Sequence, residues 1–159
     1  MSSLNLSAIE WIQELEKVIS INKYNSKKIA IDGIKFDSKA EGEFYIYLKD
    51  LKEQGKIKDI ILQEKLILQE GFKKDGKTFR PITYTVDFTF TTNTGELVRV
   101  DVKGMETQQG NLKRKMYEYK YKEKLYWVAK SKKYGNAAGW IDYDELKKKR
   151  RDAKKEVVA

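Results

Sequence analysis

The chain has 159 residues, 36% of them charged, and its 33 lysines and arginines outnumber its 24 acidic residues to give a formal net charge of +9. It contains no cysteine and no histidine, which excludes disulfides, thiolate zinc sites, imidazole bases and histidine-containing catalytic triads. Any catalysis must use carboxylates, lysines, hydroxyls or a hard metal ion. The excess of basic residues favours nucleic acid as a partner, with anionic lipid second.

The sequence also predicts a cytoplasmic protein with one main domain. No apolar run approaches the length of a membrane span, and the N-terminus lacks a signal-peptide pattern, so no membrane partner is expected. The length is sufficient for a single hydrophobic core.

The first part of the chain reads as a helix, a hairpin and a second helix. Residues 4–20 place apolar side chains at helical spacing, which predicts an amphipathic N-terminal segment over residues 1–20. Residues 29–36 suit two short strands around Asp32-Gly33. The stretch DSKAEGEFYIYLKDLKEQGK then predicts a helix capped at Ser38 and stopped at Gly55.

Strands and helices alternate along the rest of the chain. This order predicts an α/β or α+β domain over residues 21–140, built round a mixed central sheet flanked by helices, and a basic C-terminal segment over residues 141–159. The expected elements are one or two strands in residues 57–69, a turn at 74–77, a hairpin at 83–104, a helix at 111–122, a buried strand at 125–129 and a basic helix at 141–155.

The hairpin over residues 83–104, TYTVDFTFTTNTGELVRVDVKG, combines strand patterns with charged residues. Apolar side chains from Tyr84 to Phe90 alternate with polar ones, which places them on one face of the first strand and Asp87 on the other. In the second strand, valines occupy one face, and a charged run that includes Asp101 and Lys103 occupies the opposite face.

The turn between these strands predicts their register. Asn93-Thr94-Gly95 suits a three-residue loop whose last residue is left-handed, a conformation natural for glycine. This loop pairs Phe88 with Val100, apolar against apolar, so the turn and the side chains agree. It also places Asp87 opposite Asp101, with Cβ atoms roughly 4.5 to 5.5 Å apart.

Two like charges that face each other on a sheet destabilise it, unless a cation lies between them. Mg²⁺ or Mn²⁺ binds carboxylate oxygens, keeps several waters and bridges to phosphate, so Asp87 and Asp101 are candidate metal ligands open to a phosphodiester. The alternative is a pair of solvated strand acids partly neutralised by Lys103 and Arg99.

A third ligand is sought on the helix that begins near Ser38. Glu41 leans toward the apolar face of this helix, and hence toward the sheet, more than Glu43 does. Glu41 is therefore the candidate metal or supporting ligand, with Glu43 the lesser candidate. The alternative is a capping box, in which Glu41 bonds the backbone N–H of Ser38.

Two segments concentrate positive charge. Residues 113–124, KRKMYEYKYKEK, hold six basic and two acidic residues, and residues 147–155, KKKRRDAKK, hold seven basic and one acidic. Tyrosines within the first segment can stack on bases or sugars. The alternative for both is a solvated helical face, frayed at the tail.

The order of these motifs resembles the PD-(D/E)XK nucleases, whose restriction-endonuclease-like core is a mixed sheet flanked by helices. NKYNSKK, DGIKFDSKAE, FRPITYTVDF and VDVKGMET are similar to a phage and prophage family of unknown function within that superfamily, near the junction-resolving phage endonucleases. The resemblance covers residues 22–129. Val86 stands in the place of the superfamily's proline, and the second acid is Asp101 where glutamate is commoner.

The resemblance implies a role for each matching residue. Asp87 and Asp101 would hold Mg²⁺ or Mn²⁺ with the backbone carbonyl of Val102, and Glu41 would complete the ligand set. Lys103 would orient or help deprotonate the attacking water and steady the charge on phosphorus. The residues expected to contact DNA phosphates are those of the helix after the motif: Lys113, Arg114, Lys115 and Lys120.

Three functions are compatible with these observations. The favoured one is a metal-dependent DNA endonuclease that cuts branched or junction DNA in phage recombination or replication, as a homodimer in the cytoplasm of the bacterial host. The others are an end-processing exonuclease or nickase of the same fold, and a non-catalytic DNA-binding or phage–host interaction protein. Residues 4–20 would supply a dimer contact or pack on their own domain.

Overall fold

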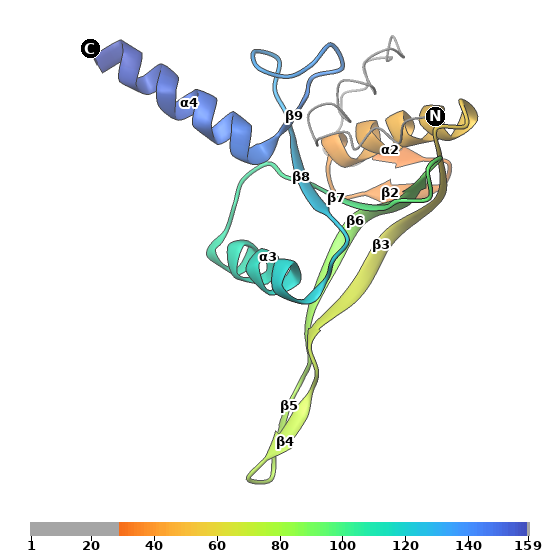
Figure 1. Cartoon of the computed structure of the whole chain (residues 1–159), viewed down its shortest axis with the longest axis vertical. Helices are drawn as coiled ribbons and strands as arrows, with labels where there is room; N and C mark the ends of the chain where they lie inside the picture. Colours follow the sequence, from red (N-terminus) through yellow and green to blue (C-terminus); the bar gives the residue numbers. More distant parts are fainter. Residues whose placement is uncertain (1–28, 159) are drawn as a thin grey trace.

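The core of the protein is a mixed five-stranded sheet in the order β3-β6-β7-β8-β9 (Figure 1). A computed structural model describes residues 29–158, and the helix predicted over residues 4–20 lies outside them. β7 and β8 are parallel, and the other neighbours are antiparallel. The elements are β1 (Ile29–Ile31), β2 (Ile34–Phe36), α2 (Lys39–Glu53), β3 (Ile57–Gln69), β4 (Phe72–Lys74), β5 (Lys77–Phe79), β6 (Ile82–Thr92), β7 (Leu97–Val102), α3 (Gln108–Lys120), β8 (Leu125–Lys130), β9 (Trp140–Asp142) and α4 (Tyr143–Val158).

Local signals account for the first hairpin and for α2, and both predictions are confirmed. β1 and β2 pair around Asp32 and Gly33, whose φ angles of 53° and 77° suit a two-residue hairpin turn. Ser38 caps α2 by accepting a hydrogen bond from the backbone N–H of Glu41 at 3.1 Å. The helix stops at Gly55, whose φ of 71° is left-handed.

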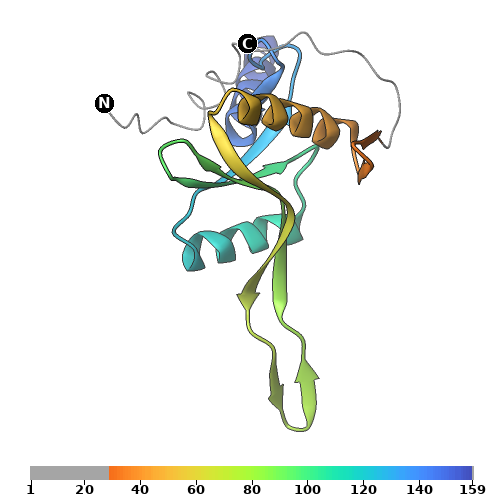
Figure 2. The same ribbon diagram turned by 90° about the vertical axis from the view of Figure 1, so that its right-hand side faces the viewer.

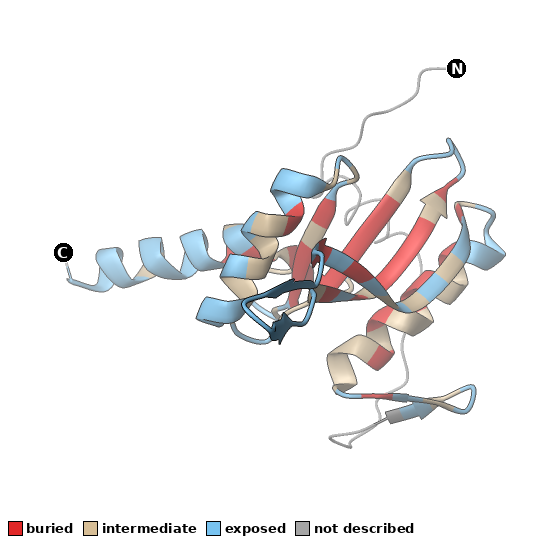
Figure 3. Ribbon diagram, turned by 90° about the horizontal axis from the view of Figure 1, so that it is seen from below, coloured by how far each residue is buried: buried red, intermediate tan, exposed pale blue. Residues whose placement is uncertain are grey.

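Helices cover the sheet from two sides (Figures 1 and 3). The buried face of α2 packs on the ends of β6 and β7 near Phe88 and Val100. A second cluster joins Tyr117 of α3, Trp127 of β8 and the first turn of α4. The predicted α/β class with a mixed central sheet is confirmed, and the arrangement is compatible with a restriction-endonuclease-like core.

One prediction about β6 is wrong. The sequence predicts that Tyr84, Val86, Phe88 and Phe90 lie on one face of the strand, but Tyr84 and Val86 belong to the cluster around α3, whereas the two phenylalanines pack near α2. β6 spans eleven residues and its pairing with β7 ends at Phe88. Right-handed twist accumulates along such a long strand, so alternate residues at its two ends meet different helices.

β3 and β6 continue past the sheet into a two-stranded arm formed by β4 and β5 (Figures 1 and 2). The predicted turn between Lys74 and Lys77 is confirmed, with positive φ at Asp75 and Gly76. Residues 69–81, which we call the arm, are all exposed. At Gly71 an added Cβ would lie 3.0 Å from Pro81 Cδ. Glycine therefore permits the two antiparallel segments of the arm to approach each other closely at its base.

The C-terminal part differs from prediction in its boundaries. The helix predicted at 111–122 spans Gln108–Lys120, because Thr107 provides an earlier cap. The helix predicted from Ile141 begins at Tyr143, since Trp140–Asp142 pair with β8 as β9. The sheet therefore crosses the predicted domain boundary at 140. None of the helices in the described residues is both long and apolar enough to cross a membrane.

Candidate active site

Asp87 on β6 and Asp101 on β7 lie side by side. The predicted register is confirmed where Phe88 faces Val100. Just beyond that pair, the backbone N–H of Asp87 donates to Oδ1 of Asp101 at 3.3 Å, and the N–H of Val102 donates to Oδ2 of Asp87 at 2.9 Å. Each carboxylate is thus held by the backbone of the opposing strand.

This pair is electrostatically unfavourable without a cation. The pKa of Asp87 is raised to about 8. Burial is the largest cause, and the negative charge of Asp101 and a hydrogen bond between the two carboxyl groups add to it. The bond from the Val102 N–H opposes this rise and does not cancel it. Asp101 itself is only 3% exposed. The fold therefore holds two acids where their simultaneous ionisation costs free energy.

A buried chain of donors positions Asp101. The hydroxyl of Tyr84 donates to Oδ2 of Asp101 at 2.7 Å, and Nε1 of Trp127 donates to the Tyr84 oxygen at 2.9 Å. The pKa of Tyr84 is raised well above its usual value, mainly by burial and next by the charge of Asp101, so the hydroxyl keeps its proton. Sequence reasoning missed both residues because each reads as ordinary core in an apolar strand.

Lys103 completes the charged cluster at the end of β7. Its Nζ lies 2.5 Å from Oδ2 of Asp101 and 4.8 Å from the centre of the Trp127 ring. The guanidinium of Arg114 lies over the same ring at 4.4 Å and pairs with Asp144 at 2.8 Å. Predicted residues from β7 and α3 therefore converge around Trp127.

Glu41 lies at the start of α2, and its pKa is affected by burial and by nearby charges, that of Asp101 among them. Its pKa is raised by burial first and by the charge of Asp37 second, with Asp101 making a smaller contribution. Glu43 is ion-paired with Lys130 instead. Within the part of the chain that the structure describes, no three acidic side chains are close enough to share a metal ion. The role of Glu41 as a ligand stays a prediction.

The donor set is nevertheless suited to Mg²⁺ or Mn²⁺. Asp87 and Asp101 present hard carboxylate oxygens at one point, and Mg²⁺ in proteins is commonly held by one or two carboxylates together with water and substrate phosphate. A divalent cation there would offset the repulsion that raises the pKa of Asp87. The chemistry of the pair thus fits the predicted metal.

The predicted phosphate-binding residues of α3 are in different environments. Lys113 and Arg114 are half-buried, whereas Lys115 and Lys120 are exposed. Nζ of Lys120 donates to the backbone carbonyl of Ile67 at 2.7 Å, so this lysine contacts β3 near the base of the arm. The structure thus places Arg114 over the Trp127 ring, which Lys103 also contacts, and Lys120 near the base of the arm.

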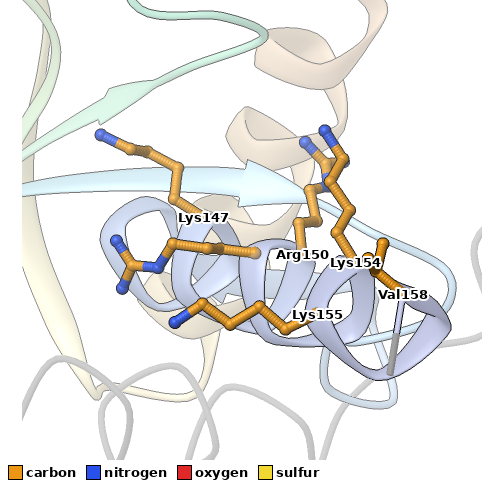
Figure 4. Close-up of a pocket in the computed structure, with 6 residues that line it drawn as sticks. Lys147, Arg150, Lys154, Lys155 and Val158 are labelled. Carbon is orange, nitrogen blue, oxygen red and sulfur yellow. The ribbon is translucent and has the colours of Figure 1, made fainter.

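A second basic surface lies along α4. Basic side chains extend from this helix on several sides (Figure 4). Beyond its first turn α4 is largely exposed and projects from the body of the protein (Figure 1). The residues that line a hollow along it are Lys147, Arg150, Arg151, Lys154, Lys155 and Val158.

Comparison with known proteins gives one match. No curated protein and no solved structure matches the chain. A family model described as "Protein of unknown function (DUF1064)" matches residues 21–136. That range includes Glu41, Asp87, Asp101, Lys103 and the arm, and it ends before α4. The chain therefore belongs to this family of proteins of unknown function, DUF1064.

Proposed function

We propose that this protein is a metal-dependent DNA endonuclease, encoded by a phage or prophage, that hydrolyses phosphodiester bonds in branched DNA such as four-way junctions. The observation that carries the proposal is the adjacent pair of half-buried Asp87 and buried Asp101, with Lys103 bonded to Asp101. A purely structural role gives no reason to place Asp87 beside an acid that already has Lys103 as its partner, whereas metal binding gives that arrangement a use.

Each residue of the cluster has a part in this chemistry. Asp87 and Asp101 would hold Mg²⁺ or Mn²⁺, with the carbonyl of Val102 and, as predicted, Glu41 adding oxygen ligands. The metal supplies Lewis acidity for attack on a phosphodiester. Lys103 places a positive charge where negative charge develops on the phosphate oxygens, and Tyr84 with Trp127 keeps Asp101 in one orientation.

The basic charge of the molecule supports a polyanionic substrate. The net charge of +9 and the cations of α3 and α4 suit backbone phosphates, which supply affinity and little sequence information. Selectivity for branched DNA, and a homodimer that cuts paired strands, are supported by the resemblance to a phage and prophage family near the junction-resolving phage endonucleases. A symmetric dimer would present two sites to a two-fold symmetric junction.

The test is cleavage of an end-labelled four-way junction and of linear and nicked duplexes with the same arm sequences. The wild-type protein, Asp87→Asn and Asp101→Asn are each incubated with Mg²⁺, Mn²⁺ or EDTA. Asp59→Asn is the matched control, because Asp59 is an exposed acid on β3 with a positive φ that asparagine tolerates.

We expect metal-dependent cleavage of the junction by the wild-type protein and by Asp59→Asn. Either substitution in the acid pair should reduce the rate at least 100-fold while leaving DNA binding in EDTA intact. Preferred cutting of linear ends or nicked duplex would assign the end-processing or nicking activity instead. Binding without cleavage of any substrate in either metal would contradict the endonuclease and leave a DNA-binding protein.

A further inference from the structure

The arm has the shape of a ribbon that extends from the strand carrying Asp87. It continues directly from β3 and β6 and points away from the helices (Figure 2). Its base is held, because Nζ of Lys120 and the hydroxyl of Tyr121 both donate to the backbone carbonyl of Ile67, at 2.7 and 2.9 Å. These bonds from the last residue of α3 and the residue that follows it fix the direction of the arm relative to the acid pair.

The surface of the arm is basic and aromatic. Phe72 and Phe79 stack on each other with ring centres 4.7 Å apart and planes 9° from parallel. They remain 44% and 43% exposed, so this apolar pair is not used to build the core. The charged residues of the arm are Glu70, Lys73, Lys74, Asp75, Lys77 and Arg80, which gives a formal excess of two positive charges.

We propose that the arm binds in a groove of duplex DNA beside the acid pair. In this arrangement Lys73, Lys74 and Lys77 neutralise backbone phosphates, and the exposed ring pair packs on sugars and base edges. The major groove of B-DNA admits a two-stranded β-ribbon, and apolar side chains on DNA-binding ribbons and arms contact bases. A second copy of this chain suits the arm less well, since the basic arm would meet a molecule of net charge +9.

The inference rests on the proposed function, because that function makes DNA the ligand. It adds where the duplex lies relative to the acid pair. Thr78 in the arm lies nine positions before Asp87 in the sequence. At about 3.3 Å per residue Thr78 lies up to about 30 Å from the acid pair, which corresponds to about nine base pairs at about 3.4 Å each. The arm is therefore expected to bind the duplex within one helical turn of the bond that is cut.

The first test measures binding of a fluorescent duplex and a four-way junction in EDTA, between about 50 and 200 mM salt. Lys73→Gln/Lys74→Gln/Lys77→Gln is compared with a charge-matched control, Lys52→Gln/Lys58→Gln/Lys132→Gln, which changes exposed lysines outside the arm. Each phosphate contact contributes about 0.9 to the slope of log K against log salt. The arm variant should reduce that slope by up to about 2.7 and weaken binding at least tenfold, with the control near the wild-type value.

A second variant, Phe72→Ser/Phe79→Ser, separates apolar contact from charge. It should weaken duplex binding about tenfold while leaving the salt slope unchanged, because no cation is lost. Sedimentation of the same variant without DNA checks the alternative partner. If the wild-type protein is a dimer and this variant a monomer with unchanged DNA affinity, the arm is a protein contact and the inference fails.

The position of the arm on the DNA is tested with a single tethered probe. The sequence contains no cysteine, so one introduced cysteine gives a unique attachment point. An iron–EDTA chelate on Thr78→Cys should cut duplex DNA in a cluster about nine base pairs from the bond that the protein hydrolyses, or from the bound junction centre when hydrolysis is not observed. The same chelate on Lys52→Cys should give no such cluster. Scattered cutting from Thr78→Cys would overturn the inference.

The two proposals fail in different ways. If the wild-type protein cleaves junctions but the arm variants bind DNA with wild-type affinity and salt slope, the arm inference is wrong and the endonuclease stands. If no DNA is cleaved but the arm variants lose affinity and the tethered probe cuts at one position, the arm inference stands and the endonuclease is wrong.

Discussion

Asp87 is a carboxyl group whose ionisation the fold opposes. Its pKa is higher in the folded chain than the ordinary value of 3.8, so the folded chain binds a proton that the unfolded chain releases. The free energy of unfolding should therefore fall as pH rises from about 4 toward about 8, by on the order of 1 to 2 kcal/mol once coupling to Asp101 is allowed for. Asp87→Asn should flatten this dependence and be the more stable protein at pH 8.

Urea unfolding in EDTA at pH 5, 6.5 and 8 measures this difference. Repeating the pH 8 series with Mg²⁺ or Mn²⁺ should stabilise the wild-type protein by an amount that grows with metal concentration, and should leave Asp87→Asn nearly unchanged. A wild-type stability that rises toward pH 8 without metal would show that the pair is not strained as the structure indicates.

Tyr84 links two buried groups, so we expect its hydroxyl to contribute to stability and to the proposed activity. Tyr84→Phe removes the donor to Asp101 and leaves the Trp127 N–H without its acceptor. An unsatisfied buried polar group costs about 1 to 3 kcal/mol, and we expect a loss of that size in urea unfolding together with slower cleavage. Tyr119→Phe is the matched control, since Tyr119 is 96% exposed, and equal losses in both variants would refute the buried chain.

At the scale of elements, the start of α2 is fixed by one side chain. Ser38→Ala removes the oxygen that accepts from the Glu41 N–H and should lower the free energy of unfolding by about 1 kcal/mol. Ser38→Asp restores an acceptor and adds a charge that the helix N-terminus favours, so it should recover most of that loss. Thermal and urea unfolding of the three proteins test this, and a neutral alanine substitution would mean that the cap is not needed.

Most of α4 lies outside the hydrophobic core and is available to bind DNA. Tyr143 and Leu146 in its first turns are buried, whereas residues beyond them face solvent. A chain that ends after Lys148 should thus retain wild-type stability but bind duplex DNA more weakly, with a smaller dependence of log K on log salt. Unchanged binding would show that the basic side chains of Figure 4 do not contact DNA.

At the scale of the whole molecule, the arm and α4 both project from the body of the protein (Figure 1). The arm extends β3 and β6 in one direction, and α4 leaves the sheet in another. Loss of both basic elements should weaken DNA binding by about the product of their separate effects, because they project in different directions (Figure 1). Gel-shift titration of the single and combined variants in EDTA measures this, and a combined loss no greater than either alone would mean that the two elements do not bind DNA at the same time.

The sequence by itself determined the features that depend on neighbouring residues. Gly95 set the turn and hence the pairing of Phe88 with Val100, which brings Asp87 to Asp101. Ser38 and Gly55 set the ends of α2 in the same way. Such features are predictable because backbone conformation and side-chain periodicity act over a few residues.

The tertiary structure alone decided the contacts between distant segments. The bonds from Trp127 to Tyr84 and from Tyr84 to Asp101 depend on the twist of β6 and on the placement of β8, and β9 exists because Trp140 and Ile141 pair with that strand. The direction of the arm depends on bonds from Lys120 and Tyr121 to Ile67. None of these leaves a local signal, since the partners are brought together by packing of the whole sheet and its helices.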